Sequence, residues 1–257
     1  MICAYKESPF LESVIESLKA QTVRGKMFLS TSTPNEYLED ICTRHGLEMT
    51  INPRPGLIGD DWNHGYDHAS TPLVTIVHQD DYYDPHYLEV FLKYVNSYKP
   101  GEVSIVFSDY FELRQNREVH HNTLLRIKRI LNFVFRIRPL NRFRFVKRRV
   151  LGFGCSICCP TVMYIKPVLG STVFDTTFKQ GLDYKIAVDL ASRKGRFVYI
   201  PKRLVGHRIH EESTTSLNIR DNTKKKEDEE ILSMLWPTFM VRIIAHFYAK
   251  SEKSNEL

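Results

Sequence analysis

The sequence predicts an α/β protein built on a mostly parallel sheet with helices on both faces. Three times in the first 72 residues, a short apolar run is followed by a segment with helical spacing, and a fourth apolar run then completes the series. Strands that alternate with helices in this way are typical of a parallel sheet covered on both sides. The chain has 257 residues, of which 42% are hydrophobic and 12% aromatic, so it can bury a large core.

The first half of the chain carries the clearest alternation. The runs expected to form strands are 1–5, 26–30, 47–51 and 73–77. Ser8 followed by Pro9 is expected to open the first helix. Thr33 to Glu36 matches the S/T-x-x-E capping box of a second helix, which Gly46 can end. A third helix is expected over 60–69.

The second half continues the pattern less regularly. Asp84-Pro85 is expected to start a helix over 84–97, and Gly195 to stop a helix over 182–194. Further strands are expected at 103–107, 160–165 and 197–200. The charge run at 221–230 is expected to be solvated surface.

Two adjacent acids, Asp80 and Asp81, end the apolar run 73–77. Ligands of parallel sheets bind beyond the carboxyl ends of the strands. Neighbouring carboxylates repel each other unless a cation neutralises them, and Mg²⁺ takes one or two carboxylates together with phosphate oxygens. The pattern therefore indicates a metal–diphosphate site. The alternative is a turn whose acids cap the next helix, a position that Asp84 already fills.

The cysteines and the absence of long apolar runs indicate a cytoplasmic protein. The cysteine count is five, which is odd, and Cys155 and Cys158 have C-x-x-C spacing with no second pair at zinc-ribbon distance. We expect buried, reduced thiols rather than a metal or redox site. No apolar run is long enough to span a membrane, and the first ten residues lack the layout of a signal peptide.

Residues 126–149 concentrate the positive charge of the chain. This segment has ten Lys and Arg and no acid, with Leu, Ile, Val and Phe interleaved, whereas the whole chain has a net charge of +6. Such a composition is typical of a segment at an anionic membrane surface. An RNA-binding arm and a solvated connector are alternatives, although the modest net charge gives no reason to expect nucleic acid as the main partner. The protein could thus be peripheral at the inner face of the cell membrane.

Three stretches resemble family 2 glycosyltransferases, in the order in which that family has them. They are "ICAYKESPFLESVIESLKAQTV" (2–23), "GLIGDDWNHGYDHASTPLVTIVHQDD" (56–81) and "FDTTFKQGLDYKIAVDLASRKGRFVYIPKRLVGHRIHEESTTS" (174–216). The resemblance implies a GT-A domain over 1–216, with a Rossmann-like nucleotide-sugar half (1–110) and an acceptor half (150–216). Residues 126–149 would be the membrane-surface or connector segment, and 217–257 a C-terminal helical extension.

The resemblance also implies an activity. Such an enzyme would be an inverting hexosyltransferase that moves a sugar from a nucleotide diphosphate, most simply a UDP-sugar, to the hydroxyl of a glycan or lipid-linked acceptor. The bacterial members resembled act in cell-surface polysaccharide biosynthesis. By this likeness the catalytic base is Asp183, and Mg²⁺ or Mn²⁺ is held by Asp80, Asp81 and His210. The implied donor contacts are Ala4, Tyr5, Glu7, Ser30, Asn63, Gln79, Asp80 and Arg208.

The chain departs from the family pattern at four places. His78 stands where an acid is usual, Leu182 where Glu is usual, and Trp62 where a basic residue is common. The stretch "STSTPN" at 30–35 replaces an acidic one, which leaves the nucleobase open. Two other functions are considered: a nucleotidyltransferase, which would usually carry a Gly-rich loop near the N-terminus where this chain has only Gly25, and a non-catalytic basic module that binds membrane or RNA.

Overall fold

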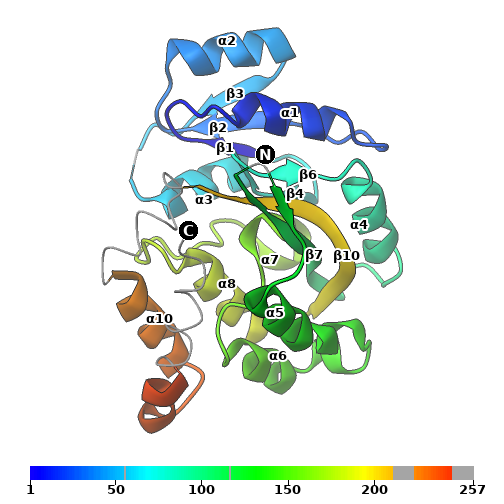
Figure 1. Cartoon of the computed structure of the whole chain (residues 1–257), viewed down its shortest axis with the longest axis vertical. Coiled ribbons are helices and arrows are strands. Elements are labelled where there is room, and N and C mark those ends of the chain that lie inside the picture. The colour runs from blue at the N-terminus through cyan, green and yellow to red at the C-terminus, as the bar shows by residue number, and fades with distance from the viewer. Residues whose placement is uncertain (55, 116, 211–222, 245–257) are drawn as a thin grey trace.

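A parallel sheet forms the upper part of the molecule (Figure 1). The computed structural model describes residues 1–54, 56–115, 117–210 and 223–244. Four strands, in the order β3-β2-β1-β5, are all parallel. They are β1 (Ile2–Ala4), β2 (Phe28–Thr31), β3 (Glu48–Ile51) and β5 (Val77–His78). The predicted parallel sheet is confirmed, and its strands all end at the same edge.

A second, mixed sheet runs through the middle of the molecule (Figure 1). Its order is β4-β9-β7-β10-β6, and a short strand β8 pairs with β7. The strands are β4 (Leu73–Thr75), β6 (Tyr82–Tyr83), β7 (Val103–Arg114), β8 (Arg117–Val119), β9 (Val162–Ile165) and β10 (Arg196–Ile209). β10 lies parallel to β7 and antiparallel to β6.

The prediction of one strand over 73–77 is wrong, because this run forms two strands in different sheets. Val74 pairs with Tyr164 of β9, whereas Val77 pairs with Ile2 of β1. Ile76 lies between them and is fully buried. Val74, Ile76 and Val77 are all buried, so the apolar pattern of the run gives no sign of the break.

Helices cover both faces, as predicted. They are α1 (Leu11–Lys19), α2 (Glu36–His45), α3 (Ile58–His68), α4 (Tyr87–Val95), α5 (Thr123–Phe133), α6 (Arg144–Leu151), α7 (Lys166–Leu169), α8 (Leu182–Ala191) and α10 (Thr223–Ser233). One apolar cluster lies under α1, α2 and α4, and the other under α3, α6 and α8. None of the helices in these described ranges is long and apolar enough to cross a membrane.

Three predicted helix starts are each shifted by two residues. The first turn of α2 is capped by Asn35, whose Oδ1 accepts the Leu38 N–H at 2.9 Å, and not by Thr33. α1 begins at Leu11, so Ser8 precedes its cap. α4 is preceded by His86 rather than by Asp84. Gly46 ends α2 with φ 64°, as expected of a left-handed cap.

The basic segment is not a simple solvated connector. It folds into α5, two 3₁₀ turns (Val134–Arg136 and Leu140–Arg142) and α6. Lys147 of α6 is fully buried, and its Nζ donates to the carbonyl oxygens of Leu190, Arg193 and Gly195 at 3.3, 2.9 and 2.8 Å. It thereby closes the C-terminal end of α8.

The charge run at 221–230 is only in part solvated surface. Residues 223–230 belong to α10, in which Glu227 and Asp228 are 9% and 5% exposed. The expectation of a wholly solvated face is wrong there, because both acids have partners inside the protein: backbone N–H groups for Glu227 and Lys224 for Asp228. Within the expected helical extension 217–257, residues 217–222 and 245–257 lie outside the described residues.

Candidate active site

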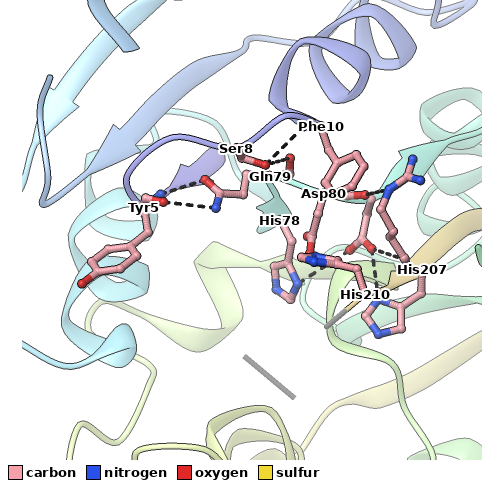
Figure 2. Close-up of polar contacts among 10 residues, drawn as sticks. Tyr5, Ser8, Phe10, His78, Gln79, Asp80, His207 and His210 are labelled. Atoms are coloured by element: carbon pink, nitrogen blue, oxygen red, sulfur yellow. Dashed lines mark hydrogen bonds and ion pairs between the residues drawn. The ribbon is translucent and has the colours of Figure 1, made fainter. Parts of the chain in front are cut away.

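The adjacent acids lie where the carboxyl end of β5 meets that of β1 (Figure 2). Cys3 of β1 pairs with His78, so residues 79–81 lie beside the loop that leaves β1. Gln79 joins the two strand ends: its Oε1 accepts the Tyr5 N–H at 2.9 Å, and its Nε2 donates to the Tyr5 carbonyl at 3.2 Å. Gln79 thus shapes the edge on which a ligand would lie.

Asp81 points into the protein. It is 1% exposed, and its Oδ1 accepts the Arg208 backbone N–H at 2.9 Å and a hydrogen bond from His207 Nδ1 at 3.0 Å. Burial lowers the pKa of His207, but the charge of Asp81 and their hydrogen bond outweigh it, so the pKa is raised overall. Asp81 therefore anchors the end of β10.

Asp80, in contrast, is only half-buried. Its Oδ2 lies 2.9 Å from His210 Nε2, and its backbone carbonyl accepts from Arg208 Nε at 2.8 Å. Burial raises the pKa of Asp80, whereas the His210 hydrogen bond and the charges of nearby histidines lower it, with a net lowering. Each of the two carboxylates thus has its own histidine partner from β10 or its end.

The geometry fits a divalent cation at this strand end. One ligand atom from each of His78, Asp80 and Asp81 lies within 4.8 Å of the others. Asp81 Oδ2 and His78 Nε2 are buried without a hydrogen-bond partner, although His78 Nδ1 is 3.6 Å from Asp81 Oδ2. Unpartnered buried acceptors are costly unless a ligand satisfies them. The expected ligand set named His210 instead of His78; His210 lies next to this group, hydrogen-bonded to Asp80.

The other expected donor residues fall into two groups. Ala4, Tyr5 and Glu7 lie at the end of β1 and on the loop after it, where Tyr5 and Glu7 are exposed. Ser30 is 2% exposed beneath α3, and Asn63 exchanges two hydrogen bonds with the backbone of Phe174, at 2.8 and 2.9 Å. Asn63 therefore joins α3 to the loop before α8, and donor contacts by Ser30 and Asn63 stay a prediction.

An acid that sequence reasoning missed lies at the end of β2. Asp61 of α3 accepts the Ser32 hydroxyl at 2.6 Å and the Asn52 Nδ2–H at 2.8 Å. Asp61 therefore supplies a carboxylate at the end of β2, where the stretch "STSTPN" (30–35) contains no acid. The only signal was the pair Asp60-Asp61, in which Asp60 accepts the Leu57 N–H and caps α3.

Asp183 lies in the first turn of α8, on the acceptor side. Its Oδ1 accepts the Tyr184 N–H at 2.8 Å, and its Oδ2 lies 3.7 Å from the Cys155 thiol. Burial raises the pKa of the Cys159 thiol, and the charges of Asp183 and then Asp81 raise it further.

Two other acids of the described part of the expected acceptor half, Asp175 and Asp189, are engaged elsewhere. Asp175 and Asp189 both form ion pairs with Lys185, at 3.3 and 2.6 Å. Asp183 forms no ion pair with any residue of the described ranges. Among these three carboxylates, Asp183 is thus the one available to a substrate hydroxyl.

The cysteines are all free thiols. Burial raises the pKa of Cys155 and Cys158 above the ordinary value for a thiol. Thiolates are therefore disfavoured at both positions. This agrees with the expectation of reduced structural thiols.

Comparison with known proteins gives one family and one fold. The family model described as Glycosyl transferase family 2 matches residues 1–168. TarS of S. aureus in complex with UDP has 13% identity and a TM-score of 0.58, over 95% of this chain and 68% of TarS. No curated protein matches the chain by sequence.

Two further structures share the fold. Glucosyl-3-phosphoglycerate synthase from Mycobacterium tuberculosis, solved with Mn²⁺, UDP and glucosyl-3-phosphoglycerate, has 16% identity and a TM-score of 0.61, over 91% of this chain and 78% of the synthase. The mannosyltransferase PcManGT from Pyrobaculum calidifontis, solved with GDP-Man and Mn²⁺, has 15% identity and a TM-score of 0.62, over 99% of this chain and 69% of PcManGT. The match over residues 1–168, on a fold that ends its first sheet in paired acids, means that the chain belongs to glycosyl transferase family 2 and is a nucleotide-sugar-dependent glycosyltransferase of GT-A fold.

Proposed function

We propose that this enzyme is an inverting, metal-dependent hexosyltransferase that uses a UDP-sugar. Its acceptor would be the hydroxyl of a glycan or lipid-linked substrate in cell-surface polysaccharide biosynthesis. The observation that carries the proposal is the group His78, Asp80 and Asp81, which has two buried, unpartnered ligand atoms at the end of β5.

The donor diphosphate would bind at the end of β5. Asp80 and Asp81 supply carboxylates, and His78 a ring nitrogen, to hold Mg²⁺ or Mn²⁺. The ion would neutralise the diphosphate and stabilise the charge of the departing nucleotide. Arg208 brings a guanidinium to the same edge, where its carbon lies 4.3 Å from the centre of the Phe10 ring. A planar guanidinium is well suited to bind two phosphate oxygens.

Asp61 gives the nucleobase a partner. Uracil presents a ring N–H, which a carboxylate held by Ser32 and Asn52 can accept. Thymine and guanine also present a ring N–H, so this contact alone does not select uracil. UDP is preferred because TarS and the glucosyl-3-phosphoglycerate synthase were both solved with it.

Asp183 would act as the general base. In an inverting transfer the acceptor oxygen attacks the anomeric carbon from the face opposite the diphosphate, and a carboxylate removes its proton. The Tyr184 N–H fixes Asp183 Oδ1 at 2.8 Å, so the carboxylate is held in one orientation. The proton of the acceptor hydroxyl would then pass to Asp183.

A thermal-shift screen tests the donor and the metal together. UDP-, dTDP- and GDP-sugars are each added with and without Mn²⁺, since a ligand that binds only the folded state raises its stability. We expect the largest rise in melting temperature with a UDP-sugar, and only when Mn²⁺ is present. A shift of equal size without Mn²⁺ would contradict the metal-dependent site.

Product analysis separates the alternatives. Release of UDP from the best donor, with sugar transferred to water or acceptor, supports the transferase. Formation of pyrophosphate from a nucleoside triphosphate and a sugar phosphate would instead support a nucleotidyltransferase. No turnover of any donor, together with no metal-dependent shift, would favour the non-catalytic module.

A further inference from the structure

Residues 126–149 present an unusual surface, which we call the basic aromatic face. Its apolar members are Ile127, Ile130, Phe133, Ile137, Phe143 and Phe145, and its outward-facing cations are Arg126, Arg136, Arg142 and Arg144. Ile130 is 73% and Phe145 68% exposed. Large exposed apolar groups clustered in one segment mark an interaction site rather than ordinary surface.

The basic side chains of this segment divide into two sets. Six of the ten are used inside the protein: Lys128, Arg129, Arg138, Lys147, Arg148 and Arg149 bond to groups of the rest of the fold. The four outward arginines form no ion pair with any residue of the described ranges. The internal bonds therefore fix the segment, and the outward arginines leave its surface strongly positive.

Guanidinium groups lie over the exposed rings. The Arg136 guanidinium lies 5.2 Å from the centre of the Phe133 ring, and that of Arg142 lies 5.1 Å from the Phe143 ring. Each pair places a guanidinium group beside an exposed apolar ring. That arrangement suits the boundary between lipid headgroups and acyl chains, where rings enter the apolar layer and guanidinium groups meet phosphates.

The apolar surface continues onto the segment after α10. The Trp236 Nε1–H donates to the Gly152 carbonyl at 2.7 Å, which fixes this segment against the end of α6. Leu235 and Val241 are buried there, whereas Phe239 is 69% exposed. The segment after α10 thus packs on the core through Leu235 and Val241 and exposes the Phe239 ring.

We propose that the basic aromatic face docks this enzyme on an anionic membrane surface. A second copy of the chain would bring like charges together, which opposes self-association through this face. RNA bases stack on open ring faces, and at Phe133 and Phe143 an arginine already covers one face. Anionic lipid headgroups match both the charge and the apolar rings.

The position of the face agrees with this role. α5 and α6 lie in the lower part of the molecule, whereas the sheet that ends in Asp80 and Asp81 lies in the upper part with α1 and α2 (Figure 1). A membrane beneath α6 would therefore leave the donor edge open to nucleotide sugar.

Vesicle co-sedimentation tests the proposal. The full chain is mixed with vesicles of phosphatidylcholine alone, or of phosphatidylcholine with phosphatidylglycerol, at increasing salt. We expect binding to the anionic vesicles only, with release as salt rises, because the Debye length falls from about 10 Å at 0.1 M to about 3 Å at 1 M. Removing Arg126, Arg136 and Arg144 together (each Arg→Gln) is expected to lower partitioning at least about tenfold, since each arginine contributes about fivefold before screening.

Matched controls separate the face from general charge. Arg24→Gln/Lys93→Gln/Lys202→Gln removes the same charge from exposed positions elsewhere and should bind as wild type does. Ile130→Ser/Phe145→Ser should weaken binding, whereas the exposed Ile51→Ser should not. Equal loss in both charge variants, equal binding to neutral vesicles, or tight binding of single-stranded RNA without vesicle binding would overturn the proposal. Dimers that disappear in the Ile130→Ser/Phe145→Ser variant, without vesicle binding, would overturn it as well.

Discussion

Glu227 is expected to hold the loop just before α8, the helix that carries the proposed base Asp183. It lies on α10 and is 9% exposed. Its carboxylate accepts three backbone N–H groups, from Lys179 at 2.8 Å, Gln180 at 2.9 Å and Gly181 at 2.8 Å. These N–H groups immediately precede α8, so the Glu227 carboxylate of α10 lies at the N-terminal end of α8, where the helix dipole is positive. Replacing Glu227 by Ala removes all three bonds at once.

The expected cost follows from these contacts. A buried donor left without a partner costs about 1–3 kcal/mol. The Gly181 N–H is buried, whereas water can reach the exposed Lys179, so the three terms do not simply add. We expect Glu227→Ala to lower the free energy of unfolding by about 3 kcal/mol, equivalent to a fall in melting temperature of about 6–12 °C for a domain of this size. Glu227→Gln, which keeps one oxygen, should cost less.

Urea unfolding and steady-state kinetics measure the two consequences. Glu229→Ala, an exposed acid on the same helix, serves as the control and should unfold as wild type does. At a temperature where Glu227→Ala is fully folded, we expect turnover to fall while donor affinity is unchanged, because only the base side is disturbed. A loss of stability below about 0.5 kcal/mol, the range of ordinary surface substitutions, would refute this account of the three hydrogen bonds.

Three further predictions concern the two acids of the site and one buried cation. Asp80→Asn should abolish Mn²⁺-dependent donor binding in calorimetric titration with the fold intact; an unchanged affinity would exclude Asp80 as a ligand. Asp183→Asn should keep donor and metal affinity but lower turnover by about 10²–10⁴-fold, and turnover within a few-fold of wild type at saturating acceptor would place the base elsewhere. Lys147→Met should lower the free energy of unfolding by about 2 kcal/mol at neutral pH, because three carbonyl oxygens at the end of α8 lose their donor. Burial and then the charge of Arg144 lower the pKa of Lys147 to about 8, so the folded protein releases this proton at a lower pH than the unfolded chain does. The stability advantage of wild type over Lys147→Met should therefore grow from about pH 8 to about pH 10. If this advantage shrinks over that range instead, the carbonyl oxygens outweigh burial in setting the pKa.

The sequence was sufficient for the elements whose signals are local. The strand–helix alternation up to residue 69, and α8 with its apolar run, follow from periodicity and from turn residues such as Gly46. β6 has only two residues, and β10 continues through the exposed residues 201–203, which no periodicity marks as strand. Tertiary pairing with β7 sets the length of β10, so local patterns could not predict it.

The residues of the site also differ in whether local sequence patterns could predict them. Asp80 and Asp81 are adjacent in the chain, so their mutual repulsion was visible and pointed to a cation. Their partners are remote: His207 is 126 residues from Asp81, and Glu227 is 46 residues from Gly181. A histidine on a strand, or an acid in a charge run, has many ordinary explanations until the fold brings its partner beside it.

β10 and the residue after it supply the partners that allow the adjacent carboxylates of Asp80 and Asp81 to lie side by side. Gly206 pairs with Tyr82, and a Cβ there would come within 2.8 Å of the Phe111 ring, so glycine lets β10 lie close to β7. The next two residues then reach the acids: His207 and the Arg208 N–H bind Asp81, and the Arg208 side chain binds the Asp80 carbonyl. Asp81 thus anchors β10 through Oδ1, while its Oδ2 has no hydrogen-bond partner among the described residues. Asp80 pairs with His210 beyond the end of β10, so β10 and the residue after it give each acid a partner of its own.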